Sequence, residues 1–140
     1  MREIKFRLIK DDKIVGYELH RTSVLFEDHH IEIYHSTDQM EWWNICSNPN
    51  RFINHDKKDQ FTGLKDKNGK EIYEGDIVKI AAKFGGNEST VIGPIVFDEE
   101  KGRFVWKDES GVLYGLSTDD KANEITGNIY ENRELMETNP

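Results

Sequence analysis

Imidazole and carboxylate groups gather where Asp28, His29, His30 and Glu32 lie close together, and His35 follows shortly after them. These groups are the usual protein ligands of zinc and other divalent metals. No pair has the four-residue spacing that brings two imidazoles together on one helix. On a strand, His29 and His35 point to the same face or to opposite faces, depending on the turn between them. The spacing therefore predicts no metal site, and nothing else in the sequence predicts a cofactor.

Cys46 and His55 are a second combination with chemical potential, because a thiol and an imidazole can act as a nucleophile and its base. The residues around Cys46 offer no glycine-rich oxyanion environment and no positively charged helix start that would favour the thiolate. We therefore interpret it as a partly buried structural cysteine. Because it is the only cysteine, the sequence excludes an intrachain disulfide and a thiol-based zinc site.

Carboxylates occur close together at Glu74 and Asp76, at residues 98–100 and at residues 119–120. Acid catalysis of the glycosidase type requires one carboxyl group that an apolar pocket keeps protonated. Each of these groups lies in a predicted turn, where water keeps it ionised. We therefore predict no catalytic residue, and a protein that is not an enzyme.

Asn68-Gly69 lies between two segments that contain apolar residues, and both of its residues tolerate positive φ at low cost. This is a strong local signal for a β-hairpin. Gly63 and Gly75 flank the hairpin. The three glycines are too widely spaced for a phosphate-binding loop, and no Lys-Ser or Lys-Thr pair follows them. We interpret Gly63, Asn68, Gly69 and Gly75 as structural turn residues.

Tyr73, Glu74 and Asp76 lie where this hairpin turns into the strand-like run at residues 77–80, and they are our candidate partner surface. A tyrosine with polar neighbours at such a corner can serve as a platform for a ligand. In the alternative, the tyrosine ring covers the core and Asp76 accepts hydrogen bonds from N–H groups of the turn. The sequence leaves both interpretations open.

Aromatic residues could form a stacking surface for single-stranded nucleic acid, and the candidates are Trp42, Trp43, Phe97, Phe104, Trp106 and Tyr114. A surface of that kind also needs a basic groove. Acidic residues at 98–100 and 108–109 flank these aromatic residues instead. We therefore interpret the aromatic residues as core.

The central stretch also carries a family resemblance. Residues 62–78 read TGLKDKNGKEIYEGDIV, which resembles the signature of the YopX family, small proteins carried by phages and prophages. Residues 2–7 (REIKFR) and 125–132 (ITGNIYEN) agree with it. Arg133 replaces the proline that often follows the Glu-Asn pair in the family, at the start of a short helix expected at 131–136. The resemblance implies a phage or prophage protein and brings no established activity with it.

The elements that must position these residues follow from alternating apolar residues and from turn residues. We predict strands at 4–8, 14–17, 23–26, 31–34, 42–45, 61–64, 72–73, 77–84, 91–97, 104–106, 112–116 and 125–129. A charged connector at 55–59 leads into the central hairpin. Residues 36–54 are ambiguous between helix and strand, and we favour a strand there.

The predicted fold is mainly β, with α+β as the alternative. Its C-terminal part is a small Src-homology-3-like barrel or a curved antiparallel sheet, with N-terminal β-hairpins packed on it. A chain of 140 residues fits one domain. We divide this domain into an N-terminal β part at 1–58 and a part with the central hairpin and the barrel at 59–140.

A net charge of −8, from 27 acidic and 19 basic residues, opposes attraction to phosphate backbones. No apolar run approaches the ~20 residues that span a bilayer, so we expect a cytoplasmic protein without a membrane partner. The expected function is that of a non-catalytic phage or prophage accessory protein, which binds an unknown protein partner or forms homo-oligomers. The alternatives are a nucleic-acid-associated or DNA-mimicking regulator and, behind it, an enzyme.

Overall fold

The described part of the chain is all β, and it contains no α-helix. This computed structural model describes residues 4–22, 31–37, 52–84, 86–116, 122–132 and 134. Its strands are β1 (Ile4–Lys10), β2 (Lys13–Thr22), β3 (Ile31–Ser36), β4 (Lys57–Lys65), β5 (Glu71–Tyr73), β6 (Asp76–Phe84), β7 (Asn87–Asp98), β8 (Arg103–Lys107), β9 (Leu113–Gly115) and β10 (Asn123–Asn128). The predicted mainly β fold is confirmed.

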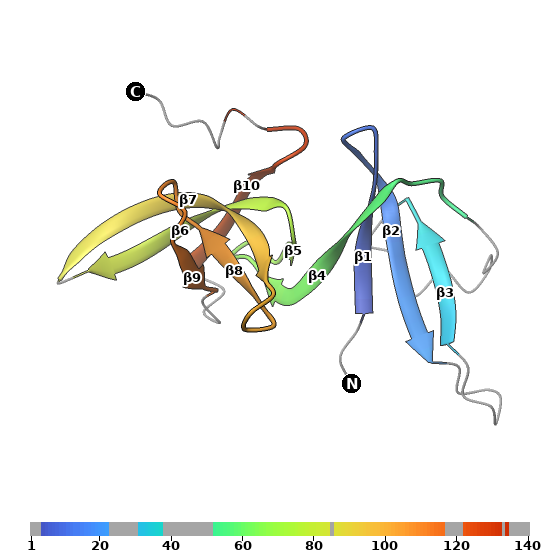
Figure 1. The fold of residues 1–140 in the computed structure, drawn as a ribbon, viewed down its shortest axis with the longest axis horizontal. Helices are drawn as coiled ribbons and strands as arrows, with labels where there is room; N and C mark the ends of the chain where they lie inside the picture. Colours follow the sequence, from blue (N-terminus) through green and yellow to red (C-terminus); the bar gives the residue numbers. More distant parts are fainter. Residues whose placement is uncertain are drawn as a thin grey trace. The chain divides into compact units, whose positions relative to one another are not determined.

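The strands form two five-stranded sheets, one in the order β3-β2-β1-β4-β5 and the other in the order β10-β6-β7-β8-β9 (Figure 1). The chain divides into two compact units, Met1–Phe61 and Thr62–Pro140. The first unit contains β1 to β3 and the beginning of β4. The second contains the rest of β4 and the strands that follow it.

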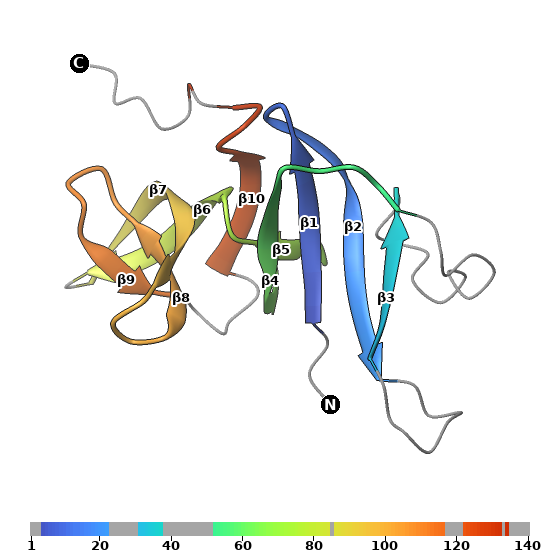
Figure 2. The same cartoon turned by 45° about the vertical axis from the view of Figure 1, so that its right-hand side comes forward.

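β1 and β2 form the predicted N-terminal hairpin, and β3 pairs with the other side of β2 (Figure 2). The hairpin turn consists of Asp11 and Asp12, whose φ values are 51° and 60°. Two consecutive left-handed residues are typical of the type I′ turn, whose twist matches that of the flanking strands. Aspartate tolerates this conformation better than most residues do.

β4 starts within the segment 55–59, where the sequence predicted a charged connector. Residues 57–60 pair with β1, and Asp59 lies opposite Arg7. Both side chains are buried, and the Nη2 atom of Arg7 donates a hydrogen bond to Oδ2 of Asp59 at 3.4 Å. A buried charge is tolerated when it is paired. This ion pair explains why a charged segment forms an inner strand.

β7 pairs with two neighbours in turn. Residues 87–94 pair with β6, and residues 95–98 pair with β8. The change of partner follows Gly93-Pro94. A Cβ atom on Gly93 would overlap the carbonyl oxygen of Lys107, and Pro94 has no N–H group to donate to a ladder. These two residues lie where β7 changes partner, and Figure 1 shows how strongly this strand curves.

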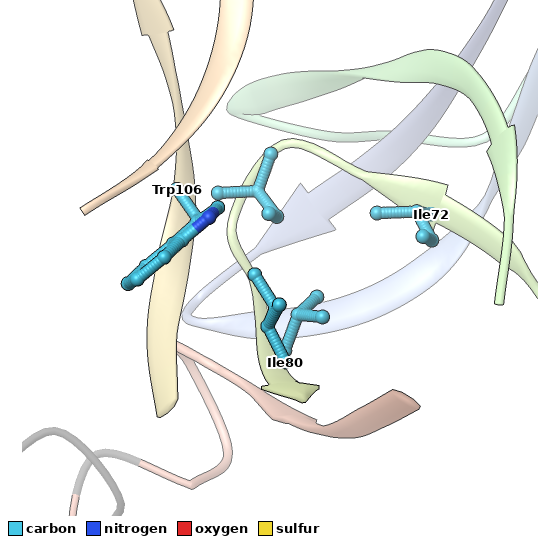
Figure 3. Close-up of a cluster of buried hydrophobic side chains, with 5 residues drawn as sticks. Ile72, Ile80 and Trp106 are labelled. Carbon is cyan, nitrogen blue, oxygen red and sulfur yellow. The ribbon is translucent and has the colours of Figure 1, made fainter. Parts of the chain in front are cut away.

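The core of the second unit is a cluster of side chains that are at most 5% exposed: Ile72, Val78, Ile80, Ile95 and Trp106. Figure 3 shows Ile72, Ile80 and Trp106, which come from three different strands. Partly buried residues pack around them: Leu64, Val91, Phe104, Tyr114, Leu116 and Ile125. Burial of each large apolar side chain contributes roughly 1.5–3 kcal/mol. This cluster is therefore a main source of stability in the second unit.

Cross-strand pairing places aromatic residues of β7, β8 and β9 on one face. Trp106 lies opposite Tyr114, and their rings stack with centroids 4.4 Å apart and an interplanar angle of 14°. Phe97 lies opposite Phe104 in an edge contact at 5.1 Å. The interpretation as core holds for Trp106, Phe104 and Tyr114, which belong to the core cluster or pack on it, whereas Phe97 is 42% exposed. Residues 42–43 lie outside the described residues.

The second sheet is open in the part of the chain that the structure describes. β10 and β9 are its two edges, and no pairing joins them into a closed barrel. Of the two predicted architectures, the curved antiparallel sheet is therefore the one observed.

Several predictions fall on undescribed residues. The predicted strands at 23–26 and 42–45 lie outside the described residues, as does part of the predicted helix at 131–136. Nowhere in the described residues does a helix have the length and apolarity needed to cross a membrane.

Candidate functional site

One face of the first sheet brings together polar side chains that are far apart in the sequence. Residues opposite one another in antiparallel strands share a face, and so do residues two positions apart in one strand. Glu18 of β2 lies opposite Phe6 of β1 and opposite His35 of β3. His20 is two residues further along β2, and Lys58 of β4 reaches the same carboxylate. We call Glu18, His20, His35 and Lys58 the Glu18 cluster.

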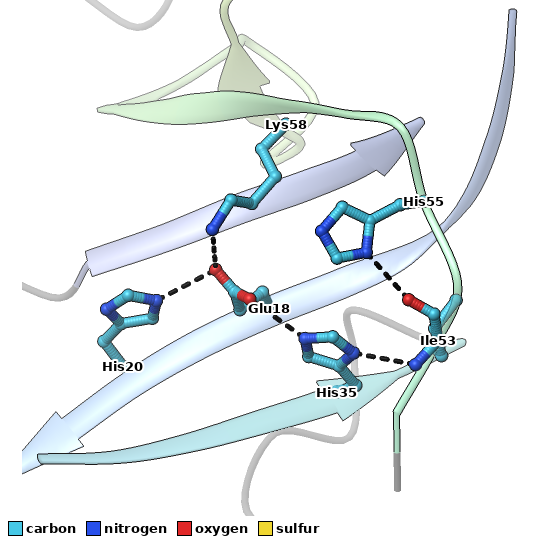
Figure 4. Close-up of polar contacts among 6 residues, drawn as sticks. All are labelled: Glu18, His20, His35, Ile53, His55 and Lys58. Carbon is cyan, nitrogen blue, oxygen red and sulfur yellow. Dashed lines mark hydrogen bonds and ion pairs between the residues drawn. The ribbon is translucent and has the colours of Figure 1, made fainter. Parts of the chain in front are cut away.

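Glu18 accepts three side-chain hydrogen bonds, although only 4% of the residue is exposed. Its Oε1 atom accepts a hydrogen bond from Nε2 of His35 at 2.9 Å. Its Oε2 atom accepts one from Nζ of Lys58 at 3.0 Å and one from Nε2 of His20 at 2.9 Å. Figure 4 shows these donors converging on the carboxylate from three strands. Hydrogen bonds to an ionised acceptor are stronger than neutral ones, so they compensate the buried charge.

The partners of Glu18 stabilise its ionised form. Burial on its own raises the pKa of this carboxyl group, because the charged form loses water. The hydrogen bonds from His35, His20 and Lys58, together with the positive charge of Lys58, outweigh burial and lower the pKa of Glu18 from 4.5 to about 2. Glu18 is therefore ionised at neutral pH and acts only as an acceptor.

Both ring nitrogens of His35 have a partner. The backbone N–H of Ile53 donates to Nδ1 at 2.9 Å, so Nδ1 carries no proton, and Nε2 must carry the hydrogen given to Glu18. The ring also contacts Phe52 and His55, with centroid distances of 5.2 Å and 5.6 Å. His35 is thus a neutral imidazole that this geometry holds in one tautomer.

His20 is the more accessible imidazole of the cluster, with 24% of its side chain exposed. Because Glu18 only accepts hydrogen bonds, Nε2 of His20 is the donor in their contact. Its other nitrogen, Nδ1, has no hydrogen-bond partner within the described residues. The ring packs against Phe6 at 5.2 Å, and Nζ of Lys58 lies 5.1 Å from the centroid of that same phenyl ring.

An exposed apolar row runs beside the Glu18 cluster on the same face. His20 lies opposite Ile4 on one side and opposite Ile33 on the other. Ile4 is 45% exposed and Ile33 is 49% exposed. We call these three residues the Ile4–His20–Ile33 row. It places an oriented imidazole between two solvent-facing isoleucine side chains.

The Glu18 cluster contains the residue types of a metal or acid–base site, but its geometry differs from that of such a site. No three or more His, Cys, Asp or Glu side chains in the described part are arranged to hold a metal ion. The two imidazoles give hydrogens to the carboxylate and do not turn lone pairs toward a common point. Glu18 already accepts three hydrogen bonds. This arrangement can fix strands relative to one another and orient His20, and the lowered pKa makes Glu18 a weak base.

Comparison with known proteins identifies the family. The model of a family described as YopX protein matches residues 5–137. The chain belongs to the YopX family. Among solved structures, it is similar to protein EF1440 from Enterococcus faecalis, with 26% sequence identity over 96% of this chain and 98% of that chain and a TM-score of 0.46. None of the curated proteins matches it.

The residues that resemble the YopX signature form the β4–β5 hairpin and the turn after it. Gly69 has a φ of +81°, as the hairpin signal predicted. Asp66 is 1% exposed, and its Oδ1 atom accepts hydrogen bonds from the N–H groups of Asn68 and Lys70, both at 2.9 Å. Its Oδ2 atom accepts one from the N–H of Ile125 in β10 at 3.1 Å. The YopX signature thus ties a hairpin turn to a distant strand.

The candidate partner surface of this YopX protein lies at the β5–β6 turn. Tyr73 is 1% exposed and Asp76 is 3% exposed, and the N–H of Tyr73 donates to Oδ2 of Asp76 at 2.8 Å. Glu74 is partly exposed. This geometry is the structural alternative that the sequence left open. Side chains as buried as Tyr73 and Asp76 stabilise the turn and offer little surface to a partner. Gly75 lies in this turn, as predicted, with a φ of +89°. Gly63 was predicted as a turn residue and has the same φ, but it lies inside β4 and not in a turn.

The closing motif of the YopX resemblance is also structural. Oδ1 of Asn128 accepts hydrogen bonds from the N–H groups of Tyr130 and Glu131 at 3.0 Å and 2.9 Å. Oδ1 of Asn132 accepts one from the N–H of Asn128 at 3.2 Å. A Cβ atom on Gly127 would lie 2.6 Å from that same oxygen of Asn132, so the motif requires glycine there.

The other candidates from the sequence have different outcomes. Residues 28–30, Cys46 and residues 119–120 lie outside the described residues. His55 donates from Nδ1 to the carbonyl oxygen of Ile53 at 2.7 Å. Asp98 caps the β7–β8 turn, where its Oδ1 atom accepts a hydrogen bond from the N–H of Glu100 at 3.1 Å.

Sequence reasoning missed Glu18, His20 and Lys58 as members of a site. Glu18 and His20 are two residues apart, and on a strand that spacing puts both on one face, so the pair could have been found. The contributions of His35 and Lys58 depend on which strands pair and in which register. That information is not local in the sequence.

Proposed function

We propose that this YopX protein is a non-catalytic phage or prophage accessory protein that binds a protein partner through the Ile4–His20–Ile33 row. The observation that carries the proposal is the row itself, in which two exposed isoleucines lie on either side of an oriented histidine. Apolar side chains that face solvent together are typical of interaction sites, whereas single ones are common on any surface.

The electrostatics next to the row support a protein partner. Glu18 and Lys58 neutralise each other at 3.0 Å, so the cluster beside the row adds no net negative charge to that face. Elsewhere the chain carries its excess of acidic residues. Protein interfaces usually have few unpaired charges at their centre and polar groups at their rim.

Two lysines that a nucleic-acid partner could contact are already paired with carboxylates, which favours a protein partner over nucleic acid. Lys58 is paired with Glu18, and Lys67 contacts Glu124 at 2.7 Å. Each cation that is already paired with a carboxylate has less to gain from a phosphate. Lys58 and Lys67 are thus engaged within the protein.

Capture of the tagged chain from phage-producing cells, followed by mass spectrometry, tests the proposal with two matched variants. Ile33→Glu places a charge in the row. Ile92→Glu places the same charge on β7 in the second unit, where the isoleucine is 43% exposed. Both positions are solvent-facing, so both variants should keep the melting temperature of the parent.

The expected result is a protein that co-purifies with the parent and with Ile92→Glu but is reduced at least about 10-fold with Ile33→Glu, a loss of about 1.4 kcal/mol in binding. A second copy of the chain as the captured protein would make the row a self-association surface, which sedimentation velocity detects. Equal capture by the two variants would exclude the row as the binding surface.

A further inference from the structure

The first sheet is crossed by a short segment that we call the strap, residues 52–56, which leads into β4. Ile53 in the strap contacts two strands. The N–H of Ile53 donates to Nδ1 of His35 on β3, and a Cβ atom added to Gly16 on β2 would lie 2.7 Å from Cδ1 of Ile53. At the end of the strap, the N–H of Asp56 donates to the carbonyl oxygen of Ile9 at 2.9 Å. Figure 4 shows His35 between the strap and Glu18.

His35 makes two hydrogen bonds of opposite direction, one to Glu18 and one to Ile53. Toward Glu18 it must donate a hydrogen, and toward Ile53 it must accept one. Only the neutral imidazole with its hydrogen on Nε2 satisfies both, because the imidazolium ion is a donor at both nitrogens. A proton on Nδ1 would face the N–H of Ile53, donor against donor. We propose that His35 is a proton-operated latch that holds the strap while neutral and releases it when protonated.

The release is confined to the strap, because the second contact of His35 survives protonation. Nε2 still donates to Oε1 of Glu18, and a charged donor strengthens that bond. The contact between β2 and β3 therefore remains. The hydrogen bond from Asp56 to Ile9 keeps the end of the strap in place. Ile53 and the aromatic ring of Phe52, which is 71% exposed and packs against His35, are the parts that are freed.

The charged and titratable groups around His35 act in both directions. Glu18 on β2 favours a positive His35, and Lys58 on β4 opposes it. His20 shares the Glu18 carboxylate from the outer side. His55 lies on the strap itself, 5.6 Å from the His35 ring, so its protonation adds a repulsion that pushes the strap away. β1 contributes the uncharged Phe6 to this environment. The latch is thus a property of the fold of this unit and does not depend on the proposed partner.

Nuclear magnetic resonance of the full-length protein tests the latch. Long-range ¹H–¹⁵N spectra report the tautomer and protonation of His35, and hydrogen exchange reports the protection factor of the Ile53 amide. As the pH is lowered, the protection factor of Ile53 should fall about 10-fold or more in step with the protonation of His35 that the spectra record, as expected for one lost hydrogen bond. The amide of Gly69, which donates to Asp66 in the second unit, is the reference and should not change.

Two variants distinguish release of the strap by His35 from a general loss of stability at low pH. His35→Gln removes the titrating group, so the pH dependence of Ile53 protection should disappear. His20→Gln removes the other imidazole on Glu18 and should leave that dependence in place. If His35→Gln does not fold, the parent protein supplies the test. The midpoint of His35 protonation should then equal the midpoint of the fall in Ile53 protection. Protection of Ile53 that is constant while His35 titrates, or a His35 that stays neutral until the whole chain unfolds, would overturn the proposal.

Discussion

Glu18 illustrates how a single interior carboxylate depends on its neighbours. Its three donors come from β2, β3 and β4, so it links strands that are separated by many residues in the chain. Replacing Glu18 leaves the Nε2–H group of His35, whose side chain is only 4% exposed, buried without its acceptor, whereas His20 and Lys58 can turn to water.

Glu18→Gln should therefore destabilise the protein by about 3 kcal/mol, because the amide is neutral and its NH₂ group cannot accept hydrogen bonds from Lys58 or from a histidine. Denaturant unfolding measures the difference. Glu99→Gln in the exposed β7–β8 turn is the control, and its effect should stay within about 0.5 kcal/mol. Similar values for the two variants would show that the cluster does not stabilise the fold.

The pH dependence of Glu18 has a definite sign. Its pKa in the folded protein is about 2, below the ordinary value of 4.5. A lowered carboxyl pKa contributes stability that is present above pH 4.5 and is lost as the pH falls toward 2. The difference in unfolding free energy between the parent and Glu18→Gln should shrink across that interval. A difference that is constant from pH 6 to pH 2 would contradict the assignment.

Gly69 is a position where the backbone alone dictates the residue. Its φ is +81°, and no atom lies within 4 Å of the place where a Cβ atom would be. Gly69→Val should destabilise the protein by about 1 kcal/mol or more, purely through conformational strain. Gly69→Asn should cost less, because asparagine tolerates positive φ. Equal unfolding midpoints for valine, asparagine and glycine would remove the argument.

At the scale of elements, one turn design occurs twice. In the β4–β5 turn, the carboxylate of Asp66 accepts hydrogen bonds from the N–H groups two and four residues later. In the β8–β9 turn, Asp108 does the same with Ser110 and Val112, at 3.0 Å and 2.8 Å. In both, the N–H of the glycine three residues on donates to the aspartate carbonyl oxygen at 3.0 Å. The pattern Asp-x-x-Gly-x thus builds the same hairpin connection in two places.

The two turns make a matched experiment. Asp66 is buried and holds a third hydrogen bond, from Ile125, whereas Asp108 is in an exposed turn. Asp66→Ala should cost about 2–3 kcal/mol and Asp108→Ala clearly less, because Asp66 is buried and its loss also frees the part-buried N–H group of Ile125. Thermal unfolding under identical conditions compares them. A larger loss for Asp108→Ala would show that the link to β10 contributes little.

The sequence predicted elements well where the signals are local. The hairpin at Asn68-Gly69, the turn at Asp11-Asp12 and the strands after Gly75 depend on neighbouring residues, and the structure contains them. The start of β4 was missed because its charges are tolerated only through Arg7, 52 residues from Asp59. The Glu18 cluster was missed for the same reason, since strand register brings its members together.

At the scale of the whole molecule, the family match covers both units, because it extends from residue 5 to residue 137. The opening motif at residues 2–7, which includes Ile4 of the row, belongs to the first unit. The residues that resemble the YopX signature, and the closing motif, lie in the second unit and make turns there. The Ile4–His20–Ile33 row lies in the first unit. The match identifies the family of the chain, and it does not identify what the first unit binds.

The overall charge leads to a prediction for nucleic acid. With −8 on the chain and Lys58 and Lys67 already paired, few counterions would be released on binding a duplex. Affinity for random duplex DNA at about 150 mM salt should be weaker than the roughly 10⁻⁴ to 10⁻⁶ M of non-specific binders. Fluorescence titration across a salt series measures it. Micromolar binding with a steep salt slope, lost when Lys57, Lys65 and Lys70 become glutamine, would make nucleic acid the partner.

The stacked rings of Trp106 and Tyr114 give the second unit an optical signature of its own. Two aromatic chromophores 4.4 Å apart and nearly parallel couple electronically, and this coupling adds to the near-ultraviolet circular dichroism of a packed core. The contribution of the pair can be isolated by subtracting the spectrum of Trp106→Phe. Followed during heating, this band reports the melting of the second sheet alone. Amide exchange along the β1–β2 ladder reports the first sheet, so the two signals together reveal whether both sheets unfold in one cooperative step.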